Sequence, residues 1–407
     1  MSKNERINAP ASFADAIMET VSAGVAAGVA MRASSECHFF GTPELVLDGR
    51  NVLNFGGCSY LGLERRVELR AGVIDAVERY GTQLSFSRMF VENCLYRELE
   101  NILEDVTRRP TLVTSTTSLG HIAALPALMT AADIIIVDRA AHASLHTAVQ
   151  LLVGSVRVVK SIDHNDLNEL EKIAQADTAE RVWYIMDGVY SMHGDLAPFA
   201  ELNDLLSRNP NVWIYADDAH ATSWAGERGE GLTLSSIDHR YLDRVVVALS
   251  LNKAFSAAGG AIVTPERAMI DRIRRVGGPM LFSGPIQPPM LGAAVASARL
   301  HVNGEARKLR DRLMLKIDLV LKRAHDEGVH LASMHRTPIF FVPIGRLERT
   351  FVIIKELFAE RFYASPGTFP AVPKGASGCR FTVSSEHSDD SIVRFMATLN
   401  RILSNNP

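Results

Sequence analysis

Reactive side chains stand directly after apolar runs in this sequence. Lys253 follows the run RVVVALS at 244–250, and Asp217 ends the run VWIYAD at 212–217. A lysine is costly to bury, because its ammonium must be paired, solvated or deprotonated. Taken singly, Lys253 can be interpreted as a solvated loop residue and Asp217 as a turn former. The question is whether the two act together.

Polar residues follow the other apolar runs in the same way. Hydroxyl, imidazole and carboxylate groups come after the runs at 111–115, 133–138 and 181–187. They belong to Thr116, Thr117, Ser118, His142 and Asp187, while His220 and Ser250 lie close to Asp217 and Lys253 in the sequence. In open α/β sheets ligands bind beyond the carboxyl ends of the strands, so these residues would meet at one edge. A helix cap or a hydrogen-bonded histidine would explain one residue, but not the shared edge.

Pyridoxal phosphate requires this combination of groups. A lysine amine can bind the cofactor aldehyde, an acid can keep the pyridine nitrogen protonated, and an imidazole can lie on the ring face. The backbone N–H groups at a helix start, aided by hydroxyls, can bind the phosphate dianion. A nucleotide site is a weaker interpretation, because the chain has no G-x-x-x-x-G-K-[ST] motif and no G-x-G-x-x-G motif opening a helix.

The elements that would position these groups alternate along the middle of the chain. Apolar runs rich in Val, Ile and Leu, a further one being SVRVVK at 155–160, are separated by amphipathic stretches. Strands that are apolar throughout predict a parallel sheet covered by helices on both faces. Helices are predicted at 142–152, 166–174 and 198–206, and near the end strands at 338–344 and 379–385 and a helix at 388–404. The predicted domains are an N-terminal helical segment (1–50), a large α/β domain (51–288) and a small α+β domain (289–407).

Net charge and cysteine content limit which kinds of partner and which cellular location we expect. The 407 residues carry a net charge of −3, which gives no electrostatic footprint for nucleic acid or a membrane surface. Four scattered cysteines without a C-x-x-C motif suggest neither a metal site nor a disulfide framework, so we expect the reducing cytoplasm. The N-terminus lacks the layout of a signal peptide, and no stretch is apolar enough for a membrane span. A small molecule or a protein is the expected partner.

Seven stretches of the chain resemble one known family. They are NFGGCSYLGL (54–63), DRAAHASL (138–145), DGVYSMHGDLAP (187–198), ADDAHAT (216–222), SLNKAF (250–255), LFSGPIQPP (281–289) and VPKGASGCRFTVSSEH (372–387). In this order they are similar to the α-oxoamine synthases, which are pyridoxal phosphate enzymes of fold type I. The resemblance implies a mostly parallel seven-stranded sheet, a smaller C-terminal domain and a homodimer with active sites at the interface.

The resemblance also implies a role for each matching residue. Lys253 would bind the cofactor and later move protons, Asp217 would pair with the pyridine nitrogen, and His220 would bond the ring oxygen. His142 would stack on the ring. The remaining cofactor contacts implied are Thr117, Ser118 and Ser250 at the phosphate, Asp187 and Ser191 near the ring oxygen and the histidines, and Ser283 across the dimer interface. Thr117 and Ser118 stand where the family usually has a glycine and an aromatic residue, and Gly284 replaces the usual threonine after Ser283.

The reaction implied joins an amino acid to an acyl thioester of coenzyme A or a carrier protein. The amino acid normally loses its carboxylate as carbon dioxide, and the product is an α-amino ketone. An aminotransferase or a decarboxylase on the same fold stays open as an alternative. A non-catalytic subunit is a third possibility, and the retained Lys253 argues against it.

Two departures from the family pattern concern the substrate carboxylate. Cys58, followed by Ser59, replaces the asparagine that contacts this carboxylate in the family, and Thr368 replaces an arginine with the same role. Alignment slippage in the loop around Thr368 is one explanation. An altered amino-donor site is the other, because a buried carboxylate needs a cation. Arg88, Arg336 or Arg380 could supply it.

A third departure lies in the block GTQLSFSRMFVENCLYRELE at 81–100. The family is rich in glycine here, whereas this chain has Leu84, Phe86, Met89 and Phe90. The block is similar to that of hydroxyketone-autoinducer synthases, which use a medium-chain acyl-CoA. The bulky residues could line an acyl-chain channel, or they could simply be core residues.

Overall fold

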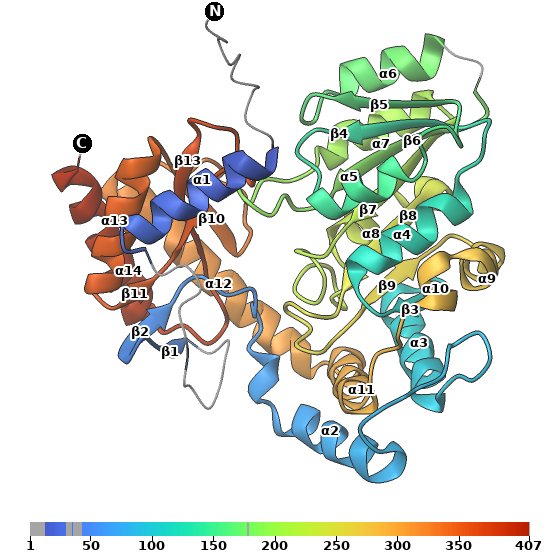
Figure 1. The fold of residues 1–407 in the computed structure, drawn as a ribbon, viewed down its shortest axis with the longest axis horizontal. Coiled ribbons are helices and arrows are strands. Elements are labelled where there is room, and N and C mark those ends of the chain that lie inside the picture. The colour runs from blue at the N-terminus through green and yellow to red at the C-terminus, as the bar shows by residue number, and fades with distance from the viewer. Residues whose placement is uncertain (1–12, 30–34, 36–42, 177–178, 407) are drawn as a thin grey trace, which may run out of the picture.

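The computed structural model describes residues 13–29, 35, 43–176 and 179–406. These residues form two lobes, a large one on the right of Figure 1 and a small one on the left. Cys37 lies outside the described residues. Among the described helices, none has both the length and the apolar character that crossing a membrane would require.

A seven-stranded sheet organises the large lobe, as predicted. Its order is β3-β9-β8-β7-β6-β4-β5. The strands are β3 (Thr111–Thr114), β4 (Ile134–Asp138), β5 (Val158–Ile162), β6 (Val182–Asp187), β7 (Val212–Asp217), β8 (Val245–Ser250) and β9 (Gly260–Val263). Only β9 runs antiparallel to its neighbours β3 and β8. The carboxyl ends of β3, β4, β6, β7 and β8 therefore share one edge, which confirms the placement predicted from the sequence.

Helices cover both faces of this sheet, because alternate residues of each strand point to opposite faces. Ile134 and Tyr184 belong to one core cluster, and their neighbours Ile135 and Trp183 belong to another. The first cluster packs against α3, α6, α7 and α11, and the second against α4, α5 and α9. The helical elements are η1 (Leu63–Arg65), α2 (Val67–Tyr80), α3 (Cys94–Thr107), α4 (Thr117–Leu128), α5 (Ala143–Gln150), α6 (Leu167–Ala176), α7 (Phe199–Arg208), α8 (Leu232–Ser236), η2 (His239–Arg244), α9 (Arg267–Val276), α10 (Gly278–Phe282) and α11 (Pro288–Val302).

The small lobe contains two three-stranded sheets and four helices among the described residues. Its strands are β1 (Glu44–Leu47), β2 (Arg50–Asn54), β10 (Ile339–Gly345), β11 (Phe362–Tyr363), β12 (Ser365–Gly367) and β13 (Ser377–Thr382), in the orders β1-β2-β11 and β10-β13-β12. Its helices are α1 (Phe13–Ala26), α12 (Glu305–Glu327), α13 (Leu347–Ala359) and α14 (Asp389–Asn405). The parallel pairing of β2 with β11 joins the N-terminal strands to the C-terminal lobe. The predicted boundary between 50 and 51 falls inside β2, and the domain limits stay a prediction.

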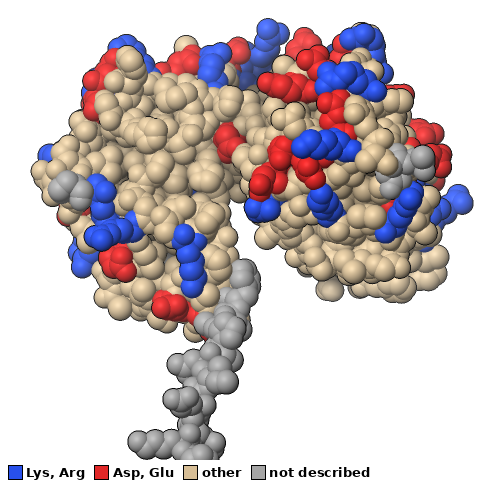
Figure 2. Space-filling view, turned by 90° about the horizontal axis from the view of Figure 1, so that it is seen from above, with Lys and Arg blue, Asp and Glu red and all other residues tan. Residues whose placement is uncertain are grey.

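Charge on the surface is mixed. On the face that Figure 2 shows, basic and acidic side chains lie interspersed over both lobes. No continuous basic stripe is visible on that face, which agrees with the small net charge of −3.

Candidate active site

A cavity of about 230 Å³ lies at the carboxyl edge of the large sheet. Its lining residues are Thr116, Thr117, Ser118, His142, Ser144, Asp187, Val189, Asp217, Ala219, His220, Ser250, Asn252 and Lys253. They come from the ends of five strands and the loops that follow them. Nine residues predicted from the sequence to share this edge are thus brought together in one place, although their individual roles stay predictions.

Asp217, the last residue of β7, is held in its ionised form. Its Oδ2 lies 2.9 Å from Nε2 of the buried His121, and its Oδ1 accepts a hydrogen bond of 2.8 Å from Ala219 N–H. Burial opposes ionisation, but the contact with His121 and the charge of Lys253 outweigh it and lower the pKa of Asp217 to about 2. Nδ1 of His121 lies 3.0 Å from the hydroxyl of Tyr215.

Sequence reasoning missed His121. It lies four residues after Thr117 on α4, so one helical turn separates it from the start of that helix. That spacing could have suggested a second residue facing the same strand ends. Its partner could not be identified without the packing of α4 against β7.

Lys253 lies in the loop between β8 and β9. Burial lowers the pKa of its ammonium, and the carboxylate of Asp217 opposes this shift. The loop is held in shape, because Asn252 Oδ1 accepts a hydrogen bond of 2.8 Å from Gly259 N–H and Lys253 C=O accepts one of 2.9 Å from Ser256 N–H. A neutral amine is the form of lysine that can act as a nucleophile or accept a proton.

Two histidines line the cavity, each with one nitrogen engaged. Nδ1 of the His142 ring lies 2.7 Å from Ser144 Oγ, and the backbone N–H of His142 donates to Asp187 Oδ1 at 3.0 Å. Nδ1 of His220 lies 2.8 Å from the hydroxyl of Tyr60, a partner that sequence reasoning also missed. Burial lowers the pKa of both imidazoles, and for His220 the nearby Lys253 lowers it further. Both rings are therefore neutral near pH 7.

Asp187 differs from Asp217 although the two residues pair side by side in β6 and β7. Burial raises the pKa of Asp187 well above its ordinary value, and the negative charge of Asp217 adds to this effect. Two adjacent carboxyl groups thus favour different protonation states, as is common where acids have separate tasks.

The start of α4 offers backbone donors to the cavity. Thr116 caps the helix by accepting a hydrogen bond of 3.0 Å from Leu119 N–H, while the Thr117 hydroxyl donates to Leu249 C=O at 3.2 Å. The first N–H groups of a helix have no partner within it, and the helix dipole favours an anion there. Gly260 lets the helix start lie close to β9, since a Cβ at this position would come within 2.5 Å of Thr117 N.

Cys58 and Ser59 line a second cavity of about 480 Å³. The two cavities share Asn252 and Lys253 in their linings. The predicted substrate residues Cys58 and Ser59 thus lie next to the predicted reactive lysine. Thr368 is buried and Ser283 is partly buried, and neither lines these two cavities.

Of the three arginines considered for a substrate carboxylate, Arg380 lies nearest to the cavity residues. Its Nε donates a hydrogen bond of 2.8 Å to Ser191 C=O, and its charge acts on the pKa values of His220 and Lys253. Arg336 instead forms an exposed ion pair with Asp318 at 2.7 Å. The remaining candidate, Arg88, also has other partners.

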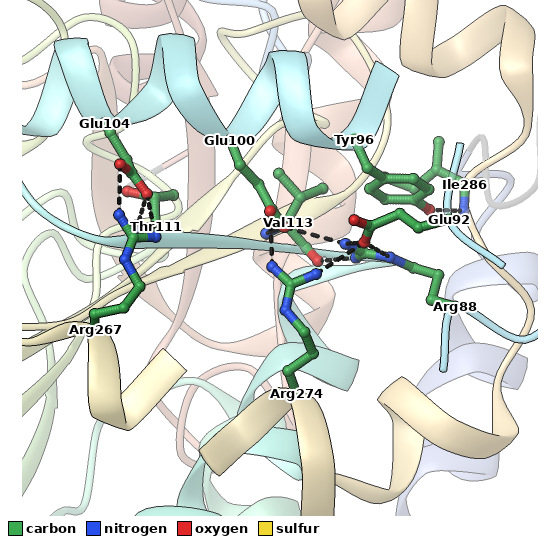
Figure 3. A network of polar contacts seen from close by, with 10 residues as sticks. All are labelled: Arg88, Glu92, Tyr96, Glu100, Glu104, Thr111, Val113, Arg267, Arg274 and Ile286. Carbon is green, nitrogen blue, oxygen red and sulfur yellow. Dashed lines mark hydrogen bonds and ion pairs between the residues drawn. The ribbon is translucent and has the colours of Figure 1, made fainter. Parts of the chain in front are cut away.

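Figure 3 shows Arg88 within a network of ion pairs. Its guanidinium contacts Glu92 at 2.5 Å and Glu100 at 3.1 Å, and Arg274 contacts the same two carboxylates at 2.8 Å each. Arg88 also stacks over the ring of Tyr96, with 3.6 Å between its Cζ and the ring centroid. The network fixes the segment 81–93 against α3 and α9. Arg88 therefore lines neither cavity.

The residues of the first cavity fit the cofactor predicted from the sequence. An amine of lowered pKa, an ionised acid, two neutral imidazoles and a helix start face the same space. This donor set contains one group for each polar part of pyridoxal phosphate. Among the described residues, no group of histidine, cysteine and acidic side chains could hold a metal ion.

A family model and a curated relative each match most of this chain. Residues 73–399 match the family model aminotransferase class I and II. The chain is 31% identical over 354 residues to the 8-amino-7-oxononanoate synthase of Thermosipho melanesiensis, which covers 86% of this chain and 87% of that protein.

Solved structures share the fold. The serine palmitoyltransferase of Sphingomonas wittichii superimposes with a TM-score of 0.86 at 22% identity, covering 98% of this chain and 99% of that one. That of S. paucimobilis, solved with PLP and myriocin bound, gives 0.86 at 21% identity and covers 96% and 97%.

Proposed function

Because the chain belongs to the aminotransferase class I and II family, in its α-oxoamine synthase branch, we propose that it is a pyridoxal phosphate-dependent acyltransferase. It condenses an amino acid with an acyl thioester to give an α-amino ketone. The observation that carries this proposal is the convergence of Lys253, Asp217 and His220 with the start of α4 in one cavity.

The residues that would hold the cofactor follow from their chemistry. Lys253 Nζ would bind its aldehyde, and the α4 start with Ser250 would bind its phosphate. Asp217, with a pKa of about 2, keeps a negative charge for the pyridine nitrogen at any physiological pH. His142 would lie on the ring, and His220 would bond the ring oxygen while Tyr60 fixes its orientation. When bound, the cofactor supplies an electron sink for the α-carbon of the substrate.

Lys253 is the residue that moves protons. Its lowered pKa allows Nζ to be neutral and to accept the α-proton of the amino acid, and the resulting ammonium can return a proton later. Asp217 lies close enough to stabilise that ammonium. The neutral imidazoles nearby add no positive charge that would oppose it.

Arg380 is the residue we propose for the carboxylate of the amino acid. Its Nε donates to Ser191 C=O, and its terminal nitrogens, beside the Tyr60 hydroxyl, would contact the carboxylate. This position would compensate for Cys58 and Thr368, which lack the groups of the family pattern. Arg380→Lys should raise KM for the amino acid at least about tenfold, because lysine cannot form the forked contact.

A homodimer is part of the proposal. Phe90 and Phe282 are 80% and 89% exposed in the single chain. Ser87 Oγ donates to Leu281 C=O at 2.8 Å, which brings the segments bearing the two rings together. Such an apolar surface supports burial against a second copy, where Ser283 would reach the partner's cofactor. The cytoplasmic location stays a prediction from the cysteine pattern.

Cofactor binding and catalysis can be tested in one preparation. Purified protein should be yellow, and borohydride should fix the cofactor to Lys253 but not to a Lys253→Ala variant. Incubation with amino acids and acyl-CoAs should release free thiol. A colourless protein that ignores added pyridoxal phosphate would contradict the proposal. If no thiol is released with any acyl chain but a keto acid supports amine exchange, the chain is an aminotransferase.

A further inference from the structure

The second cavity holds a carboxylate that the proposed mechanism does not use. Glu64, in η1, lines this space of about 480 Å³ together with Cys58, Ser59 and Ser256. Lys253 and Asn252 belong to the same lining and also to that of the first cavity. A substrate held at the cofactor beside Lys253 can therefore extend into the space that Glu64 lines.

The two oxygens of Glu64 differ in their partners. Oε2 accepts hydrogen bonds from Ser59 Oγ and, at 3.0 Å, from Ser256 Oγ. Oε1 is buried and has no hydrogen-bond partner among the described residues. The ion pairs of the described residues include none with Glu64. A buried acceptor without a donor is rare in folded proteins and costs free energy, so it calls for an explanation.

The surroundings of Glu64 favour a cationic ligand. Burial raises the pKa of Glu64, its hydroxyl partners oppose this, and the nearby carboxylate of Glu386 raises the pKa further. A ligand ammonium in this cavity would pair with the Glu64 carboxylate and offset the cost of its burial. The two serines hold Oε2 and so fix the orientation of the carboxylate.

We propose that Glu64 is a specificity-determining residue that binds an ammonium group at the far end of the amino substrate. The inference rests on the proposed function, since the cofactor beside Lys253 must hold the near end of the substrate. The amino donor then has an α-carboxylate for Arg380 and a second amine for Glu64, which makes it a diamino acid. An apolar amino acid of equal length leaves the Glu64 carboxylate without a cationic partner and binds more weakly.

Matched amino acids test this inference on the full-length holoenzyme. L-ornithine is compared with L-norvaline, and L-lysine with L-norleucine, because each pair differs only in the terminal amine. The dissociation constant is measured from the change in visible cofactor absorbance. At least one diamino acid should bind about tenfold or more tightly than its apolar counterpart, which is the value of a hydrogen bond to a charged group.

Variants identify the residue responsible. Glu64→Gln keeps the size and removes the charge, so the preference for the diamino acid should disappear. Glu386→Gln, which changes the neighbouring carboxylate outside the cavity lining, should retain it. The inference is overturned if wild type binds both members of each pair equally, a result that needs no variant. It is also overturned if the preference survives in a folded Glu64→Gln protein. A spectrum that responds to no amino acid contradicts the proposed function itself.

Discussion

His121 determines the charge state of Asp217. The imidazole is buried between Asp217 and Tyr215, with contacts of 2.9 and 3.0 Å to the two partners. Because the pKa of Asp217 is depressed to about 2, the stability gained from its charge is fully present above about pH 3.8, the ordinary value. That stability is lost only as the pH falls from there through about 2. Near neutral pH, the pair is intact.

Replacing His121 tests this relation. His121→Leu removes the donor to Asp217 Oδ2, so the pKa of Asp217 rises and its hold on the pyridine nitrogen weakens. We expect kcat/KM to fall about tenfold or more, because a hydrogen bond to a charged group contributes ~1.5–3 kcal/mol. The acidic limb of the pH–rate profile should move to higher pH. His121→Gln, whose amide can still donate, should recover part of the activity. An unchanged profile in folded His121→Leu would show that the contact does not act on Asp217.

Residues at strand ends could be predicted from the sequence, and their partners could not. Asp217 and Lys253 are identified by the apolar runs before them, since parallel strands bring such positions together. His121, Tyr60 and Glu64 act through contacts across 96, 160 and 192 positions of the chain. Such contacts depend on how helices and loops pack, which local patterns do not determine.

At the scale of elements, His164 joins the end of β4 to the loop after β6. Its Nδ1 lies 3.2 Å from Asp138 Oδ1 and its Nε2 lies 2.7 Å from Asp195 Oδ2. Asp138 is fully buried and also accepts hydrogen bonds from Tyr184 and Tyr190. The loop held in this way carries Ser191, whose carbonyl binds Arg380. His164 therefore acts as a positioning residue for the substrate side of the site.

The stability that the contacts of His164 with Asp138 and Asp195 contribute should depend on pH in a defined direction. Burial opposes protonation of His164, but Asp138 and Asp195 raise its pKa from 6.5 to about 9. The stability that it contributes is then full below pH 6.5 and declines as the pH rises to about 9.

The variant His164→Asn tests the contribution of these contacts by urea unfolding at several pH values. The difference in free energy of unfolding from wild type should be largest in acid and shrink toward pH 9. His335→Asn, at an exposed turn, serves as the control and should leave the profile unchanged. A difference that grows with pH would contradict the assignment.

Strands with a continuous apolar pattern were predicted well, and strands with a weaker pattern were not. The strands at 182–187, 212–217 and 245–250 lie within the predicted runs because they are apolar and central. The strand β5, at the sheet edge, is shifted to Val158–Ile162 and partly exposed, so its pattern is less distinct. Four residues of small and branched type form β9, which the sequence reasoning did not single out.

The whole molecule brings together segments from both ends of the chain. The strand β2 and the segment 56–64 lie beside the C-terminal lobe, while Lys253 belongs to the large lobe. The second cavity is lined by residues of both lobes, among them Tyr363 of β11 in the small lobe and Lys253 in the large lobe. The predicted division at 288 puts Tyr363 in a different domain from the segment 56–64 and Lys253, although all of them line this cavity.

Exposed apolar side chains on the large lobe support the assembly of two chains. Phe86, Met89 and Phe90 in the segment 81–93 and Phe282 of α10 expose 59%, 61%, 80% and 89% of their surface. Burying each phenylalanine is worth ~1.5–3 kcal/mol, and in a two-fold interface each ring counts twice. We therefore expect Phe90→Glu or Phe282→Glu to weaken the dimer by about two to four orders of magnitude and to reduce activity with it.

Sedimentation velocity measures this directly against the chain mass of 44.6 kDa. Wild type should sediment as a species of twice that mass, and the two glutamate variants as single chains. Met334→Glu, which alters an exposed apolar residue of the small lobe, should remain dimeric. A monomeric but fully active wild type would contradict both the dimer and the role of Ser283. If the Phe282→Glu protein is monomeric and still binds pyridoxal phosphate normally, the partner contributes to catalysis rather than to cofactor binding.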